Sequence, residues 1–128
     1  MWGFRPLSYC YQLMPPFTLD VDKAAGSTDE VTVYQLKGKL SLETVANFVT
    51  RMRQESANRL VLDMSGVNFL DSAGVGALVS LFVNRRSQGK TFALAALTPQ
   101  STAVVTVAGL QKLLPIEKTV EEATADKS

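Results

Sequence analysis

The sequence contains no histidine and a single cysteine, Cys10. Without histidine, a Ser-His-Asp triad, a histidine metal site and acid–base catalysis by an imidazole are all excluded. A lone cysteine forms no internal disulfide, which fits a reducing compartment, and it lacks the histidine that activates a papain-like nucleophile. Several classes of enzyme are therefore excluded by composition alone.

Long hydrophobic runs and an excess of one charge are also missing. The longest apolar stretch, Val75–Val83, is less than half the length of a membrane-spanning helix. Residues 9–12, Tyr-Cys-Tyr-Gln, stand where a signal peptide would be uniformly apolar, so we expect a cytoplasmic protein without membrane insertion. The net charge of +1 predicts no binding to nucleic acid, and short basic groups such as Arg85-Arg86 are interpreted as solvated helix ends.

The chain length of 128 residues predicts one domain. We expect an N-terminal extension at residues 1–16, the domain at 17–125 and a tail at 126–128. The aromatic residues of the extension indicate either that it docks on the domain or that the start is misassigned and Met14 is the true initiator. These aromatic residues are Trp2, Phe4, Tyr9 and Tyr11.

Short β-branched or apolar segments alternate with segments of helical periodicity. Strands are predicted at residues 17–21, 31–36, 60–64, 92–95 and 115–119. Helices are predicted at residues 45–58, 72–88 and 120–125, and between Pro99 and Gly109. The order β-β-α-β-α-β-α-β-α indicates an α/β fold with a mixed sheet whose central strands are parallel.

Two serines are predicted to cap helices. Ser41, with Thr44 three residues later, partly matches a capping box. Ser72 stands at the start of the second helix, where its hydroxyl can accept a bond from a main-chain N–H, and Asp71 could help to cap the same helix. Because backbone N–H groups and the helix dipole favour negative charge, this helix start also suits a phosphoryl group.

The helix at residues 72–88 carries more apolar surface than one buried face needs. Its predicted core stripe is Val75, Leu78, Val79 and Phe82. Outside that stripe lie Ala77, Leu81 and Val83. They indicate either a groove for a partner or burial of the helix on two sides, and the sequence leaves both open. Gly74 and Gly76 indicate a close approach of the helix start to the domain itself or to a partner, and we expect both to contribute.

Three segments carry a resemblance to a known family. They are Leu36-Lys37-Gly38-Lys39-Leu40-Ser41, the run from Val61 to Gly76 with its Asp71-Ser72-Ala73-Gly74 motif, and Val107–Leu110 with Leu113–Ile116. In these segments the chain resembles the anti-sigma factor antagonist family, whose fold is the STAS domain. The resemblance covers about residues 17–125.

The resemblance implies a regulatory binding protein and not an enzyme. Ser72 matches the residue that a cognate anti-sigma factor, a serine kinase of the ATP-binding kinase type, phosphorylates. The unphosphorylated form would bind that anti-sigma factor and free a sigma factor, and a PP2C-type phosphatase would reset the phosphorylated form. We expect no cofactor and no metal. The residues expected to contact the partner are Lys39, Ser41, Asp71, Ser72, Ala73, Gly74, Val75, Ala77 and Leu81.

Two alternatives accompany this interpretation. Relatives often carry an acidic residue at the position of Ser41, and its absence is compatible with a constitutive STAS interaction subunit of another signalling or lipid-transport complex. An enzyme would have to rely on carboxylates such as Asp63 and Asp71, but Asp63 is better explained as a strand-end residue bonded to nearby backbone. The sequence also contains no Walker-type phosphate loop.

Overall fold

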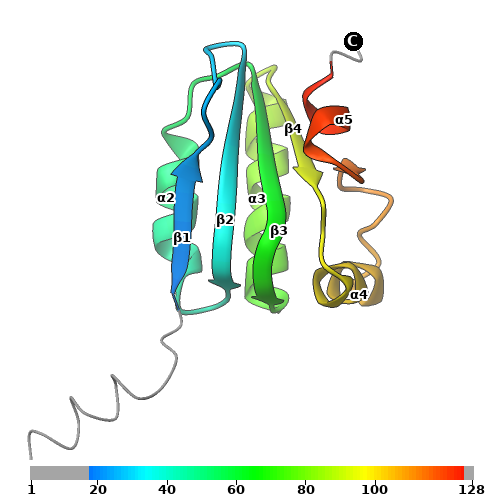
Figure 1. Ribbon diagram of the computed structural model, residues 1–128. Helices are drawn as coiled ribbons and strands as arrows, with labels where there is room; N and C mark the ends of the chain where they lie inside the picture. Colours follow the sequence, from blue (N-terminus) through cyan, green and yellow to red (C-terminus); the bar gives the residue numbers. More distant parts are fainter. Residues whose placement is uncertain (1–17, 126–128) are drawn as a thin grey trace, which may run out of the picture.

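The computed structural model describes residues 18–125, which form a five-stranded sheet with helices on both faces (Figure 1). The chain order is the predicted one. The elements are β1 (Leu19–Lys23), β2 (Val31–Leu40), α2 (Val45–Arg53), β3 (Arg59–Leu70), α3 (Ser72–Ser87), β4 (Thr91–Ala95), α4 (Pro99–Val107), β5 (Ile116–Glu117) and α5 (Val120–Thr124). The expected extension at 1–16 and the tail at 126–128 lie outside the described residues.

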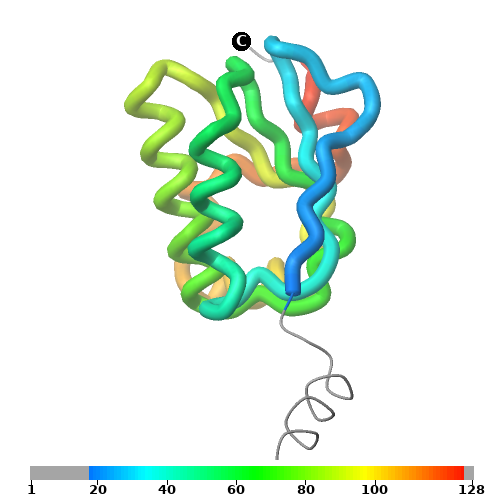
Figure 2. The backbone as a smooth tube through the Cα atoms, turned by 90° about the vertical axis from the view of Figure 1, so that its left-hand side faces the viewer, coloured from blue at the N-terminus to red at the C-terminus, as the bar shows by residue number. Residues whose placement is uncertain are grey.

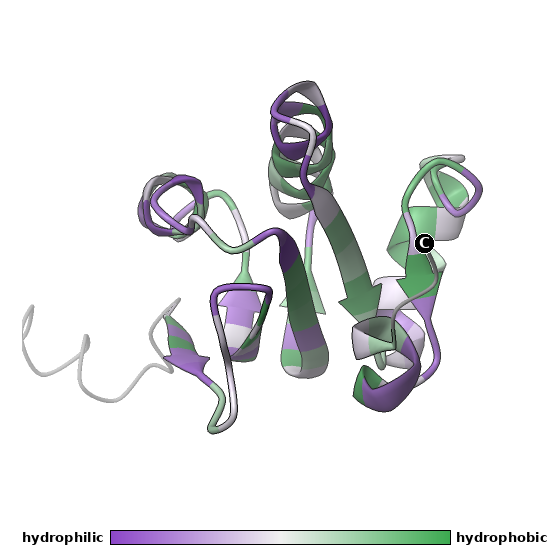
Figure 3. Ribbon diagram, turned by 90° about the horizontal axis from the view of Figure 1, so that it is seen from above, coloured by the Kyte–Doolittle hydropathy of each residue, from purple (hydrophilic) through white to green (hydrophobic). Residues whose placement is uncertain are grey.

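The strands follow one another across the sheet in chain order, from β1 to β5. β1 runs antiparallel to β2, whereas the pairs β2–β3, β3–β4 and β4–β5 are parallel. The sheet is therefore mixed with parallel central strands, as predicted. Figure 2 shows α2 and α3 side by side against one face of the sheet, and Figure 3 shows α5 on the other face.

Hydrophobic side chains are buried on both faces of the sheet. Leu60, Leu62 and Met64 of β3 belong to the main core, which includes the buried faces of α2 and α3. Val61 of the same strand belongs to a smaller cluster that contains Ala123 of α5. This alternation explains why the strand is apolar at successive positions, because a strand covered on both faces has no solvent side.

β3 is longer than the predicted strand at 60–64. The segment between the predicted strand and the predicted helix stays paired with β2 up to the Leu40–Leu70 pair, with two shifts of register on the way. Those irregularities break the alternation on which a strand prediction depends, so the sequence did not reveal the extension. β4 accompanies β3 only as far as Asp63, and α4 packs against the part of β3 beyond it.

The ends of two helices agree with their sequence signals. α3 stops before Gly89, whose φ of +74° is a conformation that favours glycine. α4 begins after Thr98, whose hydroxyl accepts a hydrogen bond from Ser101 N at 3.1 Å. α2 ends at Arg53, earlier than predicted, because the Glu55 carboxylate accepts a bond from Ala57 N and turns the chain.

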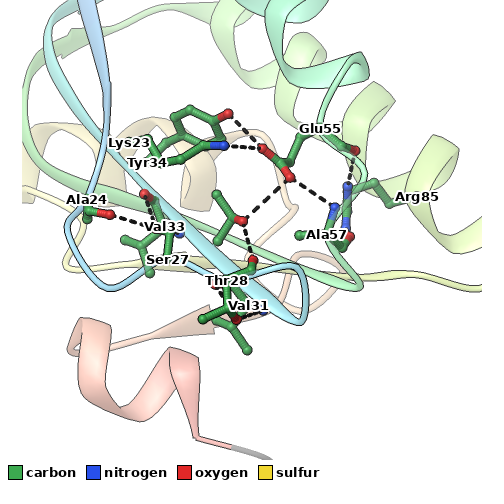
Figure 4. A network of polar contacts seen from close by, with 11 residues as sticks. Lys23, Ala24, Ser27, Thr28, Val31, Val33, Tyr34, Glu55, Ala57 and Arg85 are labelled. Atoms are coloured by element: carbon green, nitrogen blue, oxygen red, sulfur yellow. Dashed lines mark hydrogen bonds and ion pairs between the residues drawn. The ribbon is translucent and has the colours of Figure 1, made fainter.

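Arg85 is not part of a solvated helix end, which corrects the sequence interpretation. Its side chain is only 2% exposed and donates hydrogen bonds to the main-chain oxygens of Thr91, Glu55 and Ala57. Figure 4 shows this contact beside the Glu55 carboxylate, which binds Tyr34 and Lys23. These residues join the end of α3 to the first residues of the parallel strands, at the edge of the sheet opposite Ser72.

Candidate functional site

The candidate site lies where β2 and β3 end and α3 begins. Leu40 and Leu70 close the paired strands, and Asp71 N donates to Leu40 O at 3.3 Å. Ser72 is the first residue of α3 and is exposed. The structure therefore brings the Asp71-Ser72 motif to the carboxyl edge of the parallel strands, the region where sites of α/β sheets form.

Asp71, and not Ser72, caps α3. The Asp71 backbone is extended, and its Oδ1 accepts a hydrogen bond from Gly74 N at 2.9 Å. The prediction that Ser72 is the N-cap is wrong, because the chain enters the helix one residue earlier than that prediction requires, and aspartate is as good a cap as serine. Ser72 is left with a hydroxyl that makes no hydrogen bond to any residue of 18–125 in the structure.

The second carboxylate oxygen of Asp71 reaches a different element. Asp71 Oδ2 accepts a hydrogen bond from Leu42 N at 3.1 Å, in the loop between β2 and α2. Leu42 is 70% exposed although it is a large hydrophobic residue. One side chain thus holds the start of α3 and an exposed leucine in a defined arrangement.

Gly74 is needed for the close contact between α3 and the strands. A Cβ at this position would collide with Leu40 O and would lie 2.6 Å from Leu70 Cδ1. The sequence predicted that another part of the structure approaches the helix start closely. At Gly74 this part is the domain itself. A Cβ on Gly76 would meet nothing within 4 Å, so this glycine faces open space on the same helix.

Ser41 does not cap α2 with its hydroxyl. α2 begins at Val45, and Ser41 Oγ donates to Glu43 Oε1 at 2.9 Å. Only one arm of the predicted capping box forms, since Thr44 Oγ1 accepts a bond from Ser41 N at 3.0 Å. Ser41 is buried. It supports the loop that carries Leu42 but offers almost no surface.

An apolar groove of about 620 Å³ lies between the start of α3 and α4, with Ser72 among the residues that line it. Val107, on its α4 side, is 88% exposed. Sequence reasoning missed the contribution of α4. The signal was present, because valines at 104, 105 and 107 put apolar side chains on more than one face of a short helix. The lining residues are Ser72, Val75, Gly76, Ala103, Val104, Val107, Ala108 and Leu110.

Gln100 of α4 holds the strand that leads into the site. Its side-chain Nε2 donates to Leu70 O and its Oε1 accepts from Leu70 N, both at 2.9 Å. The amide thereby replaces the neighbouring strand that β3 lacks at this point. No local pattern in the sequence predicts this contact.

The residues predicted to contact a partner fall into two groups. Ser72 is exposed, and Lys39, Asp71 and Ala73 are half-buried around it. Leu81, at 1% exposure, and Ala77 belong to the main core, so two-sided burial accounts for them and they offer little surface to a partner. Ser41, Gly74 and Val75 are also buried, although Val75 lines the groove.

Lys39 lies beside an exposed aromatic ring. Its Nζ is 5.7 Å from the centre of the Phe69 ring, a distance at which a cation and an aromatic face attract each other. Both residues stand near the ends of β2 and β3, where the two strands pair Lys39 with Phe69. They add a basic and an aromatic group to the edge that carries Ser72.

The two carboxylates considered for catalysis are not brought together. Asp63 Oδ1 accepts a hydrogen bond from Ser65 N at 3.0 Å, the local backbone contact that the sequence suggested. Seven residues of β3 lie between it and Asp71, a distance on the order of 25 Å along a strand. Within residues 18–125, no cluster of three or more metal-ligating side chains occurs, and none of the helices has the length and hydrophobicity of a membrane-spanning segment.

The structure thus places an exposed serine beside an apolar groove in an α/β domain. The chain belongs to the STAS domain family, whose model matches residues 23–123. Its fold is also similar to an anti-sigma factor antagonist from Mycobacterium paratuberculosis, with a TM-score of 0.74 and 23% identity over 85% of this chain and 93% of the other.

Two further solved structures have the same fold. A STAS-domain anti-sigma factor antagonist protein from Planctomyces limnophilus has a TM-score of 0.65 and 20% identity, covering 81% of this chain and 94% of that one. The murine anion transporter Solute Carrier 26 family member A9 has a TM-score of 0.69 and 18% identity, covering 94% of this chain and 24% of the transporter. The fold therefore occurs both as a small protein and as a part of a larger one.

Proposed function

We propose that this protein is an anti-sigma factor antagonist that acts in the cytoplasm. In its unphosphorylated form it binds an anti-sigma factor that is also a serine kinase of the ATP-binding kinase type, and so frees a sigma factor. Phosphorylation of Ser72 ends the binding, and a PP2C-type phosphatase restores it. The protein acts by binding and catalyses no reaction of its own.

The observation that supports this proposal best is the position of the Ser72 hydroxyl. Asp71 caps the helix, and Ser72 is an exposed residue whose hydroxyl makes no hydrogen bond within residues 18–125. A kinase can therefore reach the hydroxyl without breaking a bond of the fold. Apart from the Asp71 cap, the first turn of α3 contains no acidic residue, and the helix dipole favours negative charge at this end.

The same charge would disturb a partner. Phosphorylation adds between about −1.5 and −2 charges at neutral pH. This charge would stand beside the carboxylate of Asp71 and at the rim of the apolar groove. A partner that buries this surface would have to desolvate both anions, which is costly without compensating cations. The switch then acts by local electrostatics, and the fold does not have to change.

The proposed contact surface surrounds Ser72. It includes the exposed Leu42 and Val107 in addition to residues predicted from the sequence. The main-chain N–H of Leu42 donates a hydrogen bond to Asp71, and Val107 lines the groove. A single partner can therefore contact the surface on both sides of Ser72. The predicted residues that keep some exposure are Lys39, Asp71, Ser72 and Ala73.

The test combines phosphosite mapping with binding. The full chain is incubated with ATP and the candidate kinase from the native host, and modified residues are mapped by mass spectrometry. Affinity for the kinase is then measured for Ser72→Ala, Ser72→Asp and a control, Ser80→Asp, which adds the same charge at an exposed position of α3. We expect Ser72→Asp to weaken binding at least tenfold, about 1.4 kcal/mol, while the other two bind as the wild type does.

A second candidate is a constitutive STAS subunit without a phosphorylation switch. The similarity of this fold to part of an anion transporter favours it, because the domain there belongs to a larger assembly. In that case Ser72→Ala, Ser72→Asp and Ser80→Asp would bind the partner equally well. An unmodified Ser72 together with equal affinities would overturn the antagonist proposal and support this one.

A further inference from the structure

The groove between α3 and α4 is an apolar surface that no residue of 18–125 covers. Ser72 contributes the only side-chain polar group to its lining, and the remaining residues are aliphatic or glycine. Val107 stands almost fully exposed beside it. Exposed apolar surfaces of this kind commonly mark a place where another segment binds.

The chain enters the domain at the same edge of the sheet. Thr18 O accepts a hydrogen bond from Lys39 N at 2.8 Å, and Lys39 pairs in turn with Phe69 of β3. Thr18 is therefore about two strand spacings, on the order of 10 Å, from the end of β3. Figure 1 shows the start of β1 and α4 at this edge.

The preceding residues have the reach and the composition to fill the groove. Seventeen residues stand before Thr18, and in extended form they span at most about 60 Å, several times the distance required. Arg5 is the only charged residue among them. They contain the only tryptophan of the chain, Trp2, and two of its three tyrosines, Tyr9 and Tyr11.

We propose that residues 1–17 bind in the groove between α3 and α4 and cover Ser72. A tether of this length gives the segment an effective concentration on the order of millimolar, so a weak contact is enough for occupancy. The consequence for regulation depends on the proposed function: the segment would compete with the kinase and the partner for the same surface. The binding of the segment itself depends only on the groove.

Cys10 allows a direct test on the full chain, because it is the only cysteine. A nitroxide spin label on Cys10 broadens the amide signals of nearby residues in the NMR spectrum of the isotope-labelled protein. We expect Ser72, Gly76 and Val107 to lose most of their intensity relative to the sample with the label reduced. Gly26, in the turn between β1 and β2 at the opposite edge, should keep its intensity. Equal intensities at both edges would overturn the proposal.

Two further measurements separate the alternatives. Mixing isotope-labelled protein without the nitroxide and unlabelled protein with it should give no broadening, and broadening of the same amides in this mixture would mean that a second copy supplies the segment. Val107→Glu should abolish the effect at Ser72, since it puts a charge into the groove without touching the core. The control is Val83→Glu, on α3 and outside the groove, where the valine is 56% exposed. Broadening that survives Val107→Glu would contradict the proposal, and neither result depends on a kinase.

Discussion

The carboxylate of Asp71 accepts a hydrogen bond from Leu42 N at 3.1 Å while its other oxygen accepts one from Gly74 N at 2.9 Å. The first bond reaches the loop after β2, and the second satisfies the start of α3. Because both bonds come from one side chain, the exposed Leu42 and the hydroxyl-bearing first turn of α3 are held together. A partner that touches both sides of Ser72 therefore meets a preorganised surface.

Replacing Asp71 should separate these two roles. Asp71→Ala removes both bonds, and we expect the free energy of unfolding to fall by about 1–2 kcal/mol, the usual range for a lost N-cap, or by slightly more. Asp71→Asn keeps one acceptor oxygen, so it can cap α3 but cannot also bind Leu42 N. We expect it to lose less stability than Asp71→Ala in urea unfolding.

The amide of Leu42 gives an independent readout. In both Asp71 variants its hydrogen exchange should become faster, because its acceptor is lost or engaged elsewhere. The amide of Gly74 should exchange faster in Asp71→Ala alone. If the hydrogen exchange of the Leu42 amide stayed unchanged in both variants, its hydrogen bond to Asp71 would not stabilise the loop after β2.

The glycines of α3 form a matched pair. Gly74→Ala puts a Cβ against Leu40 O and 2.6 Å from Leu70 Cδ1. We expect a loss of about 1–3 kcal/mol from overpacking, although alanine favours the helix by about 1 kcal/mol. Gly76→Ala meets nothing within 4 Å, so it should stabilise the protein by up to about 1 kcal/mol. Urea unfolding measures both, and equal effects at the two positions would contradict the close contact at Gly74.

Gln100 is expected to support the site from α4. Gln100→Ala removes two hydrogen bonds to the main chain of Leu70, and at about 0.5–1.5 kcal/mol each the loss should be about 1–3 kcal/mol. The Leu70 amide should also exchange faster. The control is Thr102→Ala, at an exposed position of the same helix, which should change stability by no more than about 0.5 kcal/mol. A Leu70 amide that stays equally protected would mean that α4 does not hold the strand end.

The sequence predicted the order of elements because each had a local signal. Thr98-Pro99 before a helix and Gly89 after one are such signals, and the structure has both. What the sequence did not reveal depends on distant contacts. The continuation of β3 beyond Met64 relies on pairing with β2 across two register shifts. The burial of Arg85 relies on carbonyl groups from residues 55–57 and Thr91.

The candidate site shows the same division. The Asp71-Ser72 motif could be placed at a helix start from local sequence, but which of the two residues caps α3 depends on where the chain leaves β3. The groove is also lined by α4, and the spacing of residues along the chain does not show that α4 lies close to Ser72 in space. Local patterns therefore located the site, and tertiary contacts decide the role of each residue.

Glu55 links β1, β2 and the end of α2 at the edge opposite Ser72. Its carboxylate accepts hydrogen bonds from Tyr34 Oη at 2.7 Å and Ala57 N at 2.9 Å, and Lys23 Nζ lies 3.4 Å away. Burial raises the pKa of the Glu55 carboxyl, but the hydrogen bonds from Tyr34 and Ala57 and the Lys23 charge outweigh it, so the pKa lies below the ordinary glutamate value. The ionised form is therefore the one that stabilises the fold.

The contribution of Glu55 to stability should depend on pH. It is fully present above the ordinary glutamate pKa of about 4.3 and is lost as the pH falls through the lower pKa of the folded protein, because protonation then favours the unfolded chain. Glu55→Gln should be less stable than the wild type at neutral pH, and the difference should shrink as the solution is acidified. The control is Asp20→Asn, at an exposed position of β1, which should follow the wild-type curve. Urea unfolding across this range measures the effect, and a constant difference between Glu55→Gln and the wild type would contradict a stabilising carboxylate.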